Sequence, residues 1–155
     1  MSQSDAFDLF STYLRMRADA SVECLPVDET FWERIAAGEL GALQNEHLVS
    51  CYTFDTAWPV WEVHPKGDEI VCLLSGSATF LLENESGTRA IELTEPGTCV
   101  VIPKGTWHTA KTKSPCRMLF ITPGEGTTHR QAYPWLHGKL GSRTQSCGVM
   151  NKNRT

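Results

Sequence analysis

The chain has 155 residues, of which 41% are hydrophobic and 21% charged, and this composition suits one globular domain. The formal net charge is −4 and the Lys and Arg residues are scattered, so we expect no nucleic-acid partner. No run of about 18 apolar residues occurs, and the first residues, MSQSDAFDLF, carry acids where a secretory signal would be basic. We therefore expect a cytoplasmic protein without a membrane segment.

Residues 1–44 are predicted to form a helical segment that packs on the main domain or on a partner subunit. Ser2 and Asp5 have the spacing of a capping box at the start of a first helix. Apolar residues then recur at helical spacing, namely Phe7, Phe10 and Leu14.

A second, shorter helix is predicted over the sequence TFWERIAAGEL. Thr30 and Glu33 form another capping box in this stretch, and Gly38 is a suitable residue to end the helix. The two helices are expected to lie outside the main domain, without a catalytic role.

Residues 45–123 are predicted to form an all-β barrel. Short β-branched and aromatic runs alternate here with turn residues, at the spacing of a sandwich or barrel of about eight strands. Such a barrel just holds side chains or one small ligand. The predicted strands are HLVSCYTF, VWEV, EIVCLL, ATFLLE, RAIEL, TCVVI, WHTAKT and RMLFIT.

Residues 124–155 are expected to be a loop and tail. Three apolar residues in this segment, Tyr133, Trp135 and Leu136, are expected to dock on the barrel, and the polar end from about Ser142 is expected to fray.

The six cysteines contain no C-x-x-C pair, and we expect them to be free thiols in a reducing compartment. Those in strand-like runs are expected to act as small hydrophobic residues. The cysteines are Cys24, Cys51, Cys72, Cys99, Cys116 and Cys147, of which Cys72, Cys99 and Cys116 lie in such runs.

Charged and imidazole side chains interrupt the apolar pattern at one place, the stretch EVHPKGDE. Successive strand residues face opposite sides, so Glu62 and His64 share a face, and the turn that follows returns the chain to Glu69. A later turn, PKG, leads back to His108. Unpaired ionised groups are costly at the end of an apolar barrel, and a divalent cation balances them. Such ligands suit Fe(II), Mn, Ni, Co or Zn, without favouring one.

The two stretches resemble the paired motifs of the cupin superfamily. The first cupin motif is usually His, one residue, His, three or four residues, Glu, six residues, Gly. This sequence has Glu62, His64, Glu69 and Gly76 in that frame. The second motif is matched by Gly97, Pro103, Gly105 and His108, with Thr112 where Asn is common.

The resemblance implies a single-domain cupin with a conserved barrel, a double-stranded β-helix of the jelly-roll type, here with N-terminal helices. It also implies a homodimer and a divalent metal ion held by His64, Glu69 and His108. Glu62 replaces the first histidine of the family pattern and would be the fourth ligand. The additional negative charge favours harder cations and weakens the likeness to cupin dioxygenases rich in histidine.

Two functions from different classes fit these features. The first is a metal-dependent enzyme acting on a small molecule, with oxygenase chemistry slightly preferred over isomerase or lyase chemistry and no catalytic residue assigned. The second is a non-catalytic barrel that binds or senses a small ligand. A dimerisation module is a third possibility, and fold alone does not separate these functions.

Other polar and aromatic residues near the motifs are given structural roles. Asp68 is interpreted as a turn or cap residue, although it is also an alternative to Glu69 as ligand. His129 is interpreted as a solvated loop residue beside Arg130. Trp61 is expected to face away from the ligands. His47 and His137 are assigned no function.

Overall fold

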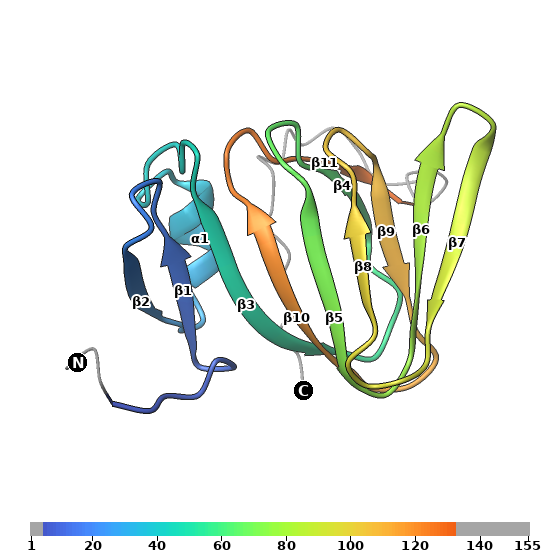
Figure 1. The fold of residues 1–155 in the computed structure, drawn as a ribbon, viewed down its shortest axis with the longest axis horizontal. Coiled ribbons are helices and arrows are strands. Elements are labelled where there is room, and N and C mark those ends of the chain that lie inside the picture. Colours follow the sequence, from blue (N-terminus) through green and yellow to red (C-terminus); the bar gives the residue numbers. More distant parts are fainter. Residues whose placement is uncertain (1–4, 133–155) are drawn as a thin grey trace, which may run out of the picture.

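Two antiparallel sheets make up most of the computed structural model, which describes residues 5–132 (Figure 1). One sheet has the strand order β2-β1-β3-β10-β5-β8 and the other has the order β11-β4-β9-β6-β7. The elements of the first sheet are β1 (Thr12–Met16), β2 (Val22–Pro26), β3 (His47–Phe54), β5 (Glu69–Ser75), β8 (Cys99–Ile102) and β10 (Cys116–Pro123). Those of the second are β4 (Val60–Val63), β6 (Ala78–Asn84), β7 (Gly87–Leu93), β9 (His108–Lys111) and β11 (Thr128–Gln131), and one helix, α1, covers Phe31–Ala36.

The eight strands expected between residues 45 and 123 are confirmed as β3 to β10. Alternating burial along β5, β6, β8 and β10 explains why the sequence pattern predicts these strands. In β5, for example, Glu69, Val71 and Leu73 are buried, whereas Ile70 and Leu74 are exposed. One face of each such strand therefore lines the interior between the sheets.

The main core lies between the two sheets and is rich in aromatic residues. The rings of Tyr52 and Phe120 stack with centroids 4.2 Å apart, and the Trp58 ring meets Phe80 edge-on at 5.7 Å. Phe80 and Leu82 are buried, as the alternation of their strand predicts. This packed interior holds the strand ends from which the charged side chains project.

A glycine makes the close approach of two strand ends possible. Gly76 has a φ of +78°, and a Cβ at this position would lie 2.5 Å from the carbonyl oxygen of Pro115. Only glycine adopts this conformation readily and leaves room for that oxygen. The last residue of the first motif is therefore required where β5 meets the start of β10.

The prediction of a first helix in residues 1–44 is wrong for the part of this segment that the structure describes, which begins at residue 5. Residues Thr12–Met16 form strand β1, which pairs with both β2 and β3 and extends the first sheet. Tyr13 is fully buried and meets Phe31 edge-on at 5.1 Å, so strand pairing and this packing override the helical spacing. The predicted cap residue Ser2 lies outside the described residues.

The second predicted helix is confirmed as α1, but the expected capping box does not form. Thr30 makes no side-chain cap, and its hydroxyl instead donates to Asp28 Oδ1 at 2.8 Å. The helix ends at Ala36 with Ala37 as its C-cap, and Gly38 follows as the predicted stop, with a φ of +79° and a bond from its N–H to the Ile35 carbonyl. Helix α1 packs through Phe31 against a small second core beside β1 and β3 (Figure 1).

The polypeptide beyond residue 123 contributes a further strand, β11, which pairs with β4. The predicted docking of Tyr133, Trp135 and Leu136 and the predicted fraying of the polar end concern residues outside the described range. The domain boundaries at residues 44 and 123 stay predictions. None of the helices within residues 5–132 combines the length and apolar character needed to cross a membrane.

Candidate metal centre

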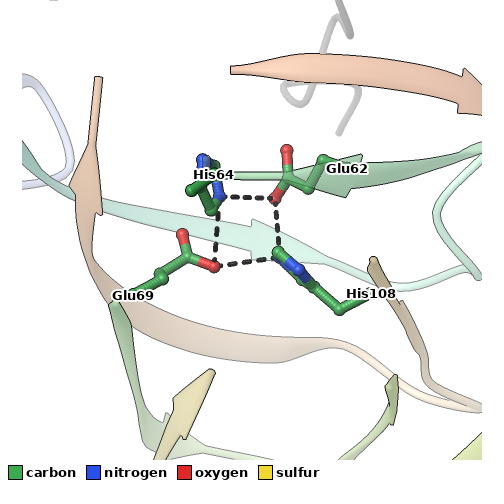
Figure 2. Close-up of side chains that lie close together, drawn as sticks. All are labelled: Glu62, His64, Glu69 and His108. Atoms are coloured by element: carbon green, nitrogen blue, oxygen red, sulfur yellow. Dashed lines mark ion pairs between the residues drawn. The ribbon is translucent and has the colours of Figure 1, made fainter. Parts of the chain in front are cut away.

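The four residues predicted as ligands lie together at one end of the interior (Figure 2). Glu62 is in β4, His64 follows the same strand, Glu69 begins β5, and His108 begins β9. Glu62 and His108 are direct partners in the β4–β9 pair. The Gly105 N–H donates to the His64 carbonyl at 2.9 Å, so the turn of the second motif is tied to the first. All four residues are buried, with exposed fractions of 0–5%.

The inner side-chain atoms of these four residues face one another in a closed ring of four ion pairs (Figure 2). Glu69 Oε2 lies 3.0 Å from His108 Nε2 and 3.5 Å from His64 Nε2. Glu62 Oε1 lies 3.5 Å from His108 Nε2 and 4.0 Å from His64 Nε2. Each carboxylate thus offers one oxygen to both imidazole rings.

The other nitrogen of each imidazole is held by a partner outside the ring. His64 Nδ1 lies 2.9 Å from Thr127 Oγ1, whose hydroxyl donates to the carbonyls of Pro123 and Gly124. The threonine oxygen therefore accepts the proton of His64 Nδ1. His108 Nδ1 donates to the Thr106 carbonyl at 3.1 Å. In a neutral imidazole, which is the form that binds a metal ion, bonds of this kind select the tautomer whose Nε2 lone pair faces the centre.

The outer oxygen of each carboxylate is held in the same way. The Thr122 hydroxyl donates to Glu69 Oε1 at 2.6 Å. His129 Nε2 lies 3.2 Å from Glu62 Oε2. Every one of the four ligand side chains is thus oriented by a second contact, and only its inner atom is directed to the ring.

Three of the inner atoms are buried and have no partner outside the ring, namely His64 Nε2, Glu69 Oε2 and His108 Nε2. Buried polar atoms that face only one another need an explanation such as an ion. Donors around one first-row metal ion at about 2.0–2.2 Å lie roughly 3–4 Å from one another. The ring distances of 3.0–4.0 Å fall in this range, so the residues fit a divalent cation.

The electrostatics of the ring favour positive charge at its centre. Burial disfavours a charged His108, but the carboxylates of Glu62 and Glu69 outweigh it and raise the pKa of His108 to about 10. Burial also opposes ionisation of Glu69, yet the imidazoles of His108 and His64 hold the pKa of this carboxyl below its ordinary value. The carboxylates are therefore stabilised as anions, which is the form that binds a cation.

The interpretation of His129 as a solvated loop residue is wrong in its loop part. His129 is exposed, as expected, but it lies in strand β11 and is the register partner of Glu62, which its ring contacts. The supporting residues Thr122 and Thr127 likewise lie outside the motifs, and no spacing in the sequence connects them to the cluster. Thr106 lies two residues before His108, at a position of the second motif that the pattern leaves unspecified. Pairing of β11 with β4, which would have revealed His129, is a tertiary feature.

Asp68 is outside the buried cluster, and its Oδ1 accepts a bond from the Lys104 N–H at 2.8 Å, which ties the first turn to the PKG turn of the second motif. The rings of Trp61 and Trp107 both lie under the guanidinium of Arg130, at 5.4 and 4.4 Å from their centroids. A hollow of about 70 Å³ on this side of the molecule contains none of the four ligands. It is lined by Trp58, Trp61, Leu81, Thr109, Lys111 and Ala132.

No family model matches the chain. An uncharacterized protein of Acanthamoeba polyphaga mimivirus is 42% identical over 48 residues, 31% of this chain and 29% of that protein. The chain therefore matches less than a third of that relative's length.

Several solved structures are similar to part of the chain. A cupin-2 domain protein from Shewanella frigidimarina is 25% identical, with a TM-score of 0.43 over 50% of this chain and 70% of that one. Hydroquinone 1,2-dioxygenase from Sphingomonas is 16% identical, with a TM-score of 0.44 over 52% and 60% of the respective chains. A mutant of Bacillus subtilis oxalate decarboxylase is 15% identical, with a TM-score of 0.44 over 56% of this chain and 24% of that one.

Residues of both sequence motifs converge between the two antiparallel sheets and form one buried cluster. The chain is cupin-like. In this cupin-like chain Glu62 occupies the place of the first family histidine and takes part in the ring on equal terms with the other three residues. The departure from the family pattern therefore retains a donor at that corner, and it changes that donor from neutral nitrogen to anionic oxygen.

Proposed function

We propose that the protein is a metal-dependent enzyme of the cupin type that acts on a small organic molecule. Glu62, His64, Glu69 and His108 would hold a divalent ion such as Fe, Mn, Ni, Co or Zn. The observation that carries the proposal is the set of three buried inner atoms that face only one another while the outer atoms of the same side chains are engaged elsewhere. Two carboxylate and two imidazole donors favour harder cations more than a set of histidines would.

Four protein ligands leave room for substrate on an ion that accepts five or six donors. A bound ion would supply Lewis-acid or redox chemistry to a substrate oxygen. The chain's own contribution is preorganisation: Thr122 and His129 fix the two carboxylates, so each presents a single oxygen. Oxygenase chemistry is preferred slightly over isomerase or lyase chemistry, because such donors with open positions suit Fe(II) and oxygen.

A second function is favoured by the deep burial of the cluster. His108 and Glu69 are at most 1% exposed, and the hollow at Trp61 does not include them. In that alternative the ion has a structural role and the protein binds or senses a small ligand without converting it. The two functions differ in whether a metal-bound form turns over candidate substrates.

The first test is the metal content of protein purified without a metal-chelating column. Inductively coupled plasma mass spectrometry would compare wild type with His64→Ala and His108→Ala, with His47→Ala as a control histidine outside the cluster. We expect near-stoichiometric metal in wild type and His47→Ala and its loss in both cluster variants. Absence of bound metal in wild type, also after addition of each cation, would overturn the proposal.

A substrate screen with the identified metal then separates the enzyme from the binding barrel. The enzyme would be supported by turnover in wild type that is lost in Glu69→Gln and that added metal does not restore in this variant. Ligand binding that perturbs the metal spectrum without any product would support the alternative.

A further inference from the structure

Two cysteines face each other across neighbouring strands, one within each sequence motif but at a position that the motif does not specify. Cys72 in β5 and Cys99 in β8 are direct register partners, and the two strands run side by side in Figure 1. Both belong to the set expected to act as inert small hydrophobic residues. Their juxtaposition is a feature of the sheet register and not of the sequence spacing.

The pair occupies a non-hydrogen-bonded position of the antiparallel ladder. The Leu73 N–H donates to the Thr98 carbonyl at 2.9 Å, and these are the residues just after Cys72 and just before Cys99. Hydrogen-bonded and non-hydrogen-bonded pairs alternate along an antiparallel ladder, so the pair next to Leu73 and Thr98 exchanges no backbone hydrogen bond. Facing side chains approach most closely at such sites, where Cα atoms are about 4.5 Å apart. That separation lies within the range compatible with a disulfide.

The two thiols lie on the same side of the sheet and are reached from outside. Their side chains lie on the face of the sheet opposite to the buried Val71, Leu73 and Val100, with Cys72 half-buried and Cys99 exposed. Strand β8 is the last strand of its sheet, so Cys99 is on an open edge. A hydrogen bond with Cys99, together with burial, raises the pKa of the Cys72 thiol to about 11.

The remaining cysteines of the described residues do not form a second pair of this kind. Cys51 and Cys116 are buried, and Cys24 is half-buried opposite Leu14. Cys51 and Cys72 are both opposite Leu119, on either side of β10, which keeps them two strands apart. Among residues 5–132, Cys72 and Cys99 are therefore the cysteine pair in which the two residues face each other and one thiol is exposed to solvent.

We propose that Cys72 and Cys99 are a redox modification site that closes to a cross-strand disulfide when a hydroperoxide oxidises Cys99. Cys99 reacts first because it is the exposed thiol, and reaction requires access and the thiolate form. Cys72 is the resolving residue. The bond joins the edge strand β8 covalently to β5, and a thiol reductant reverses it.

The reaction balances in two steps. The Cys99 thiolate attacks one peroxide oxygen and breaks the O–O bond, and the leaving hydroxide or alkoxide takes up the proton that the thiol lost. A sulfenic acid and one molecule of water or alcohol result. The Cys72 sulfur then bonds to the Cys99 sulfur, and the Cys72 proton leaves with the sulfenic hydroxyl as water. The two sulfurs together lose two electrons and the peroxide gains them.

The test treats reduced, full-length protein with hydrogen peroxide in the presence of a chelator, so that bound metal plays no part. Trypsin places the two cysteines in different peptides, residues 67–89 and 90–104, and the other four cysteines in further ones. We expect a mass loss of two hydrogens, a loss of two alkylatable thiols, and a linked peptide that joins Cys72 to Cys99. Dithiothreitol should restore both thiols.

Two variants and a control distinguish this route from non-specific oxidation. Cys72→Ser should accumulate a dimedone-reactive sulfenic acid on Cys99, whereas Cys99→Ser should form no disulfide at Cys72. Cys24→Ser should behave as wild type, and circular dichroism would establish that all variants fold. Links between molecules, links through another cysteine, or the same mixture of links in urea-unfolded protein would overturn the proposal, as would resistance to peroxide that oxidises a free cysteine peptide.

Discussion

His129 Nε2 lies 3.2 Å from Glu62 Oε2, across the β11–β4 pair in which the two residues are direct register partners. The contact leaves Glu62 Oε1 directed at His108 and His64. Glu62 is thereby held as a single-oxygen donor. A residue from outside both cupin-like motifs thus orients the ligand that departs most from the family pattern.

Replacement of His129 should weaken metal binding without removing a ligand. In His129→Ala the Glu62 carboxylate loses its outer contact, and loss of such contacts typically lowers metal affinity by about 10–100-fold. Competition with a chromophoric chelator would measure the affinity. His129→Gln, which retains a donor, should recover part of the loss, and His47→Ala should have no effect. Equal affinity in His129→Ala and wild type would contradict the orienting role.

Thr122 should stabilise the fold through its bond to Glu69. Thr122→Val keeps the side-chain shape but leaves Glu69 Oε1 without its 2.6 Å donor. A buried acceptor that loses its donor costs about 1–3 kcal/mol, and a charged acceptor costs more. The free energy of unfolding of Thr122→Val should therefore be lower than that of wild type by about 1–3 kcal/mol or more. Urea denaturation of the metal-free protein would measure the difference. Thr53→Val, at an exposed position of β3, is the matched control and should stay within about 0.5 kcal/mol of wild type. A similarly small change in Thr122→Val would contradict this role.

Gly76 should tolerate alanine less well than Gly97 does. Both residues have positive φ, at +78° and +87°, so alanine strains the backbone at each by about 1–2 kcal/mol. At Gly76 the new Cβ also meets the Pro115 carbonyl at 2.5 Å, whereas at Gly97 no atom lies within 4 Å. Thermal and urea unfolding of Gly76→Ala and Gly97→Ala would compare the two. Equal destabilisation would show that the β5–β10 corner adjusts to the additional carbon.

Tyr13 should make the protein less stable in strong alkali. Burial, with a smaller effect of Cys51, raises the pKa of Tyr13 from 10.0 to about 12. A raised folded-state pKa means that the neutral phenol is favoured in the fold. This contribution to stability is therefore complete below pH 10 and is lost as the pH rises through about 12.

The variant Tyr13→Phe isolates this contribution. The Tyr13 hydroxyl is buried without a hydrogen bond, so its removal should cost little near pH 7. Urea denaturation between pH 9 and 12 should show a smaller loss of unfolding free energy in Tyr13→Phe than in wild type. Parallel pH profiles for the two proteins would contradict the assignment of this titration to Tyr13.

Much of the barrel follows from local sequence, because a strand with one buried face alternates in polarity and turn residues separate such strands. The runs of β3 to β10 carry this signal, and the spacing of the motifs brings Glu62, His64, Glu69 and His108 to one end of the interior. The same local reasoning is wrong for Thr12–Met16, because the apolar residues have helical spacing but the segment forms a strand. There, the sheet edge of β3 and the burial of Tyr13 against Phe31 determine the conformation.

The sequence by itself determined the four residues of the buried cluster, the positions of strands β3 to β10 and the glycine at the β5–β10 corner, since each depends on local spacing along the chain. The tertiary structure alone decided which residues support the ligands and which cysteines meet. Thr122, Thr127 and His129 lie 53, 63 and 67 residues from the ligands that they contact. Such contacts depend on the register in which distant strands pair, and a shift of one residue would turn each side chain to the opposite face.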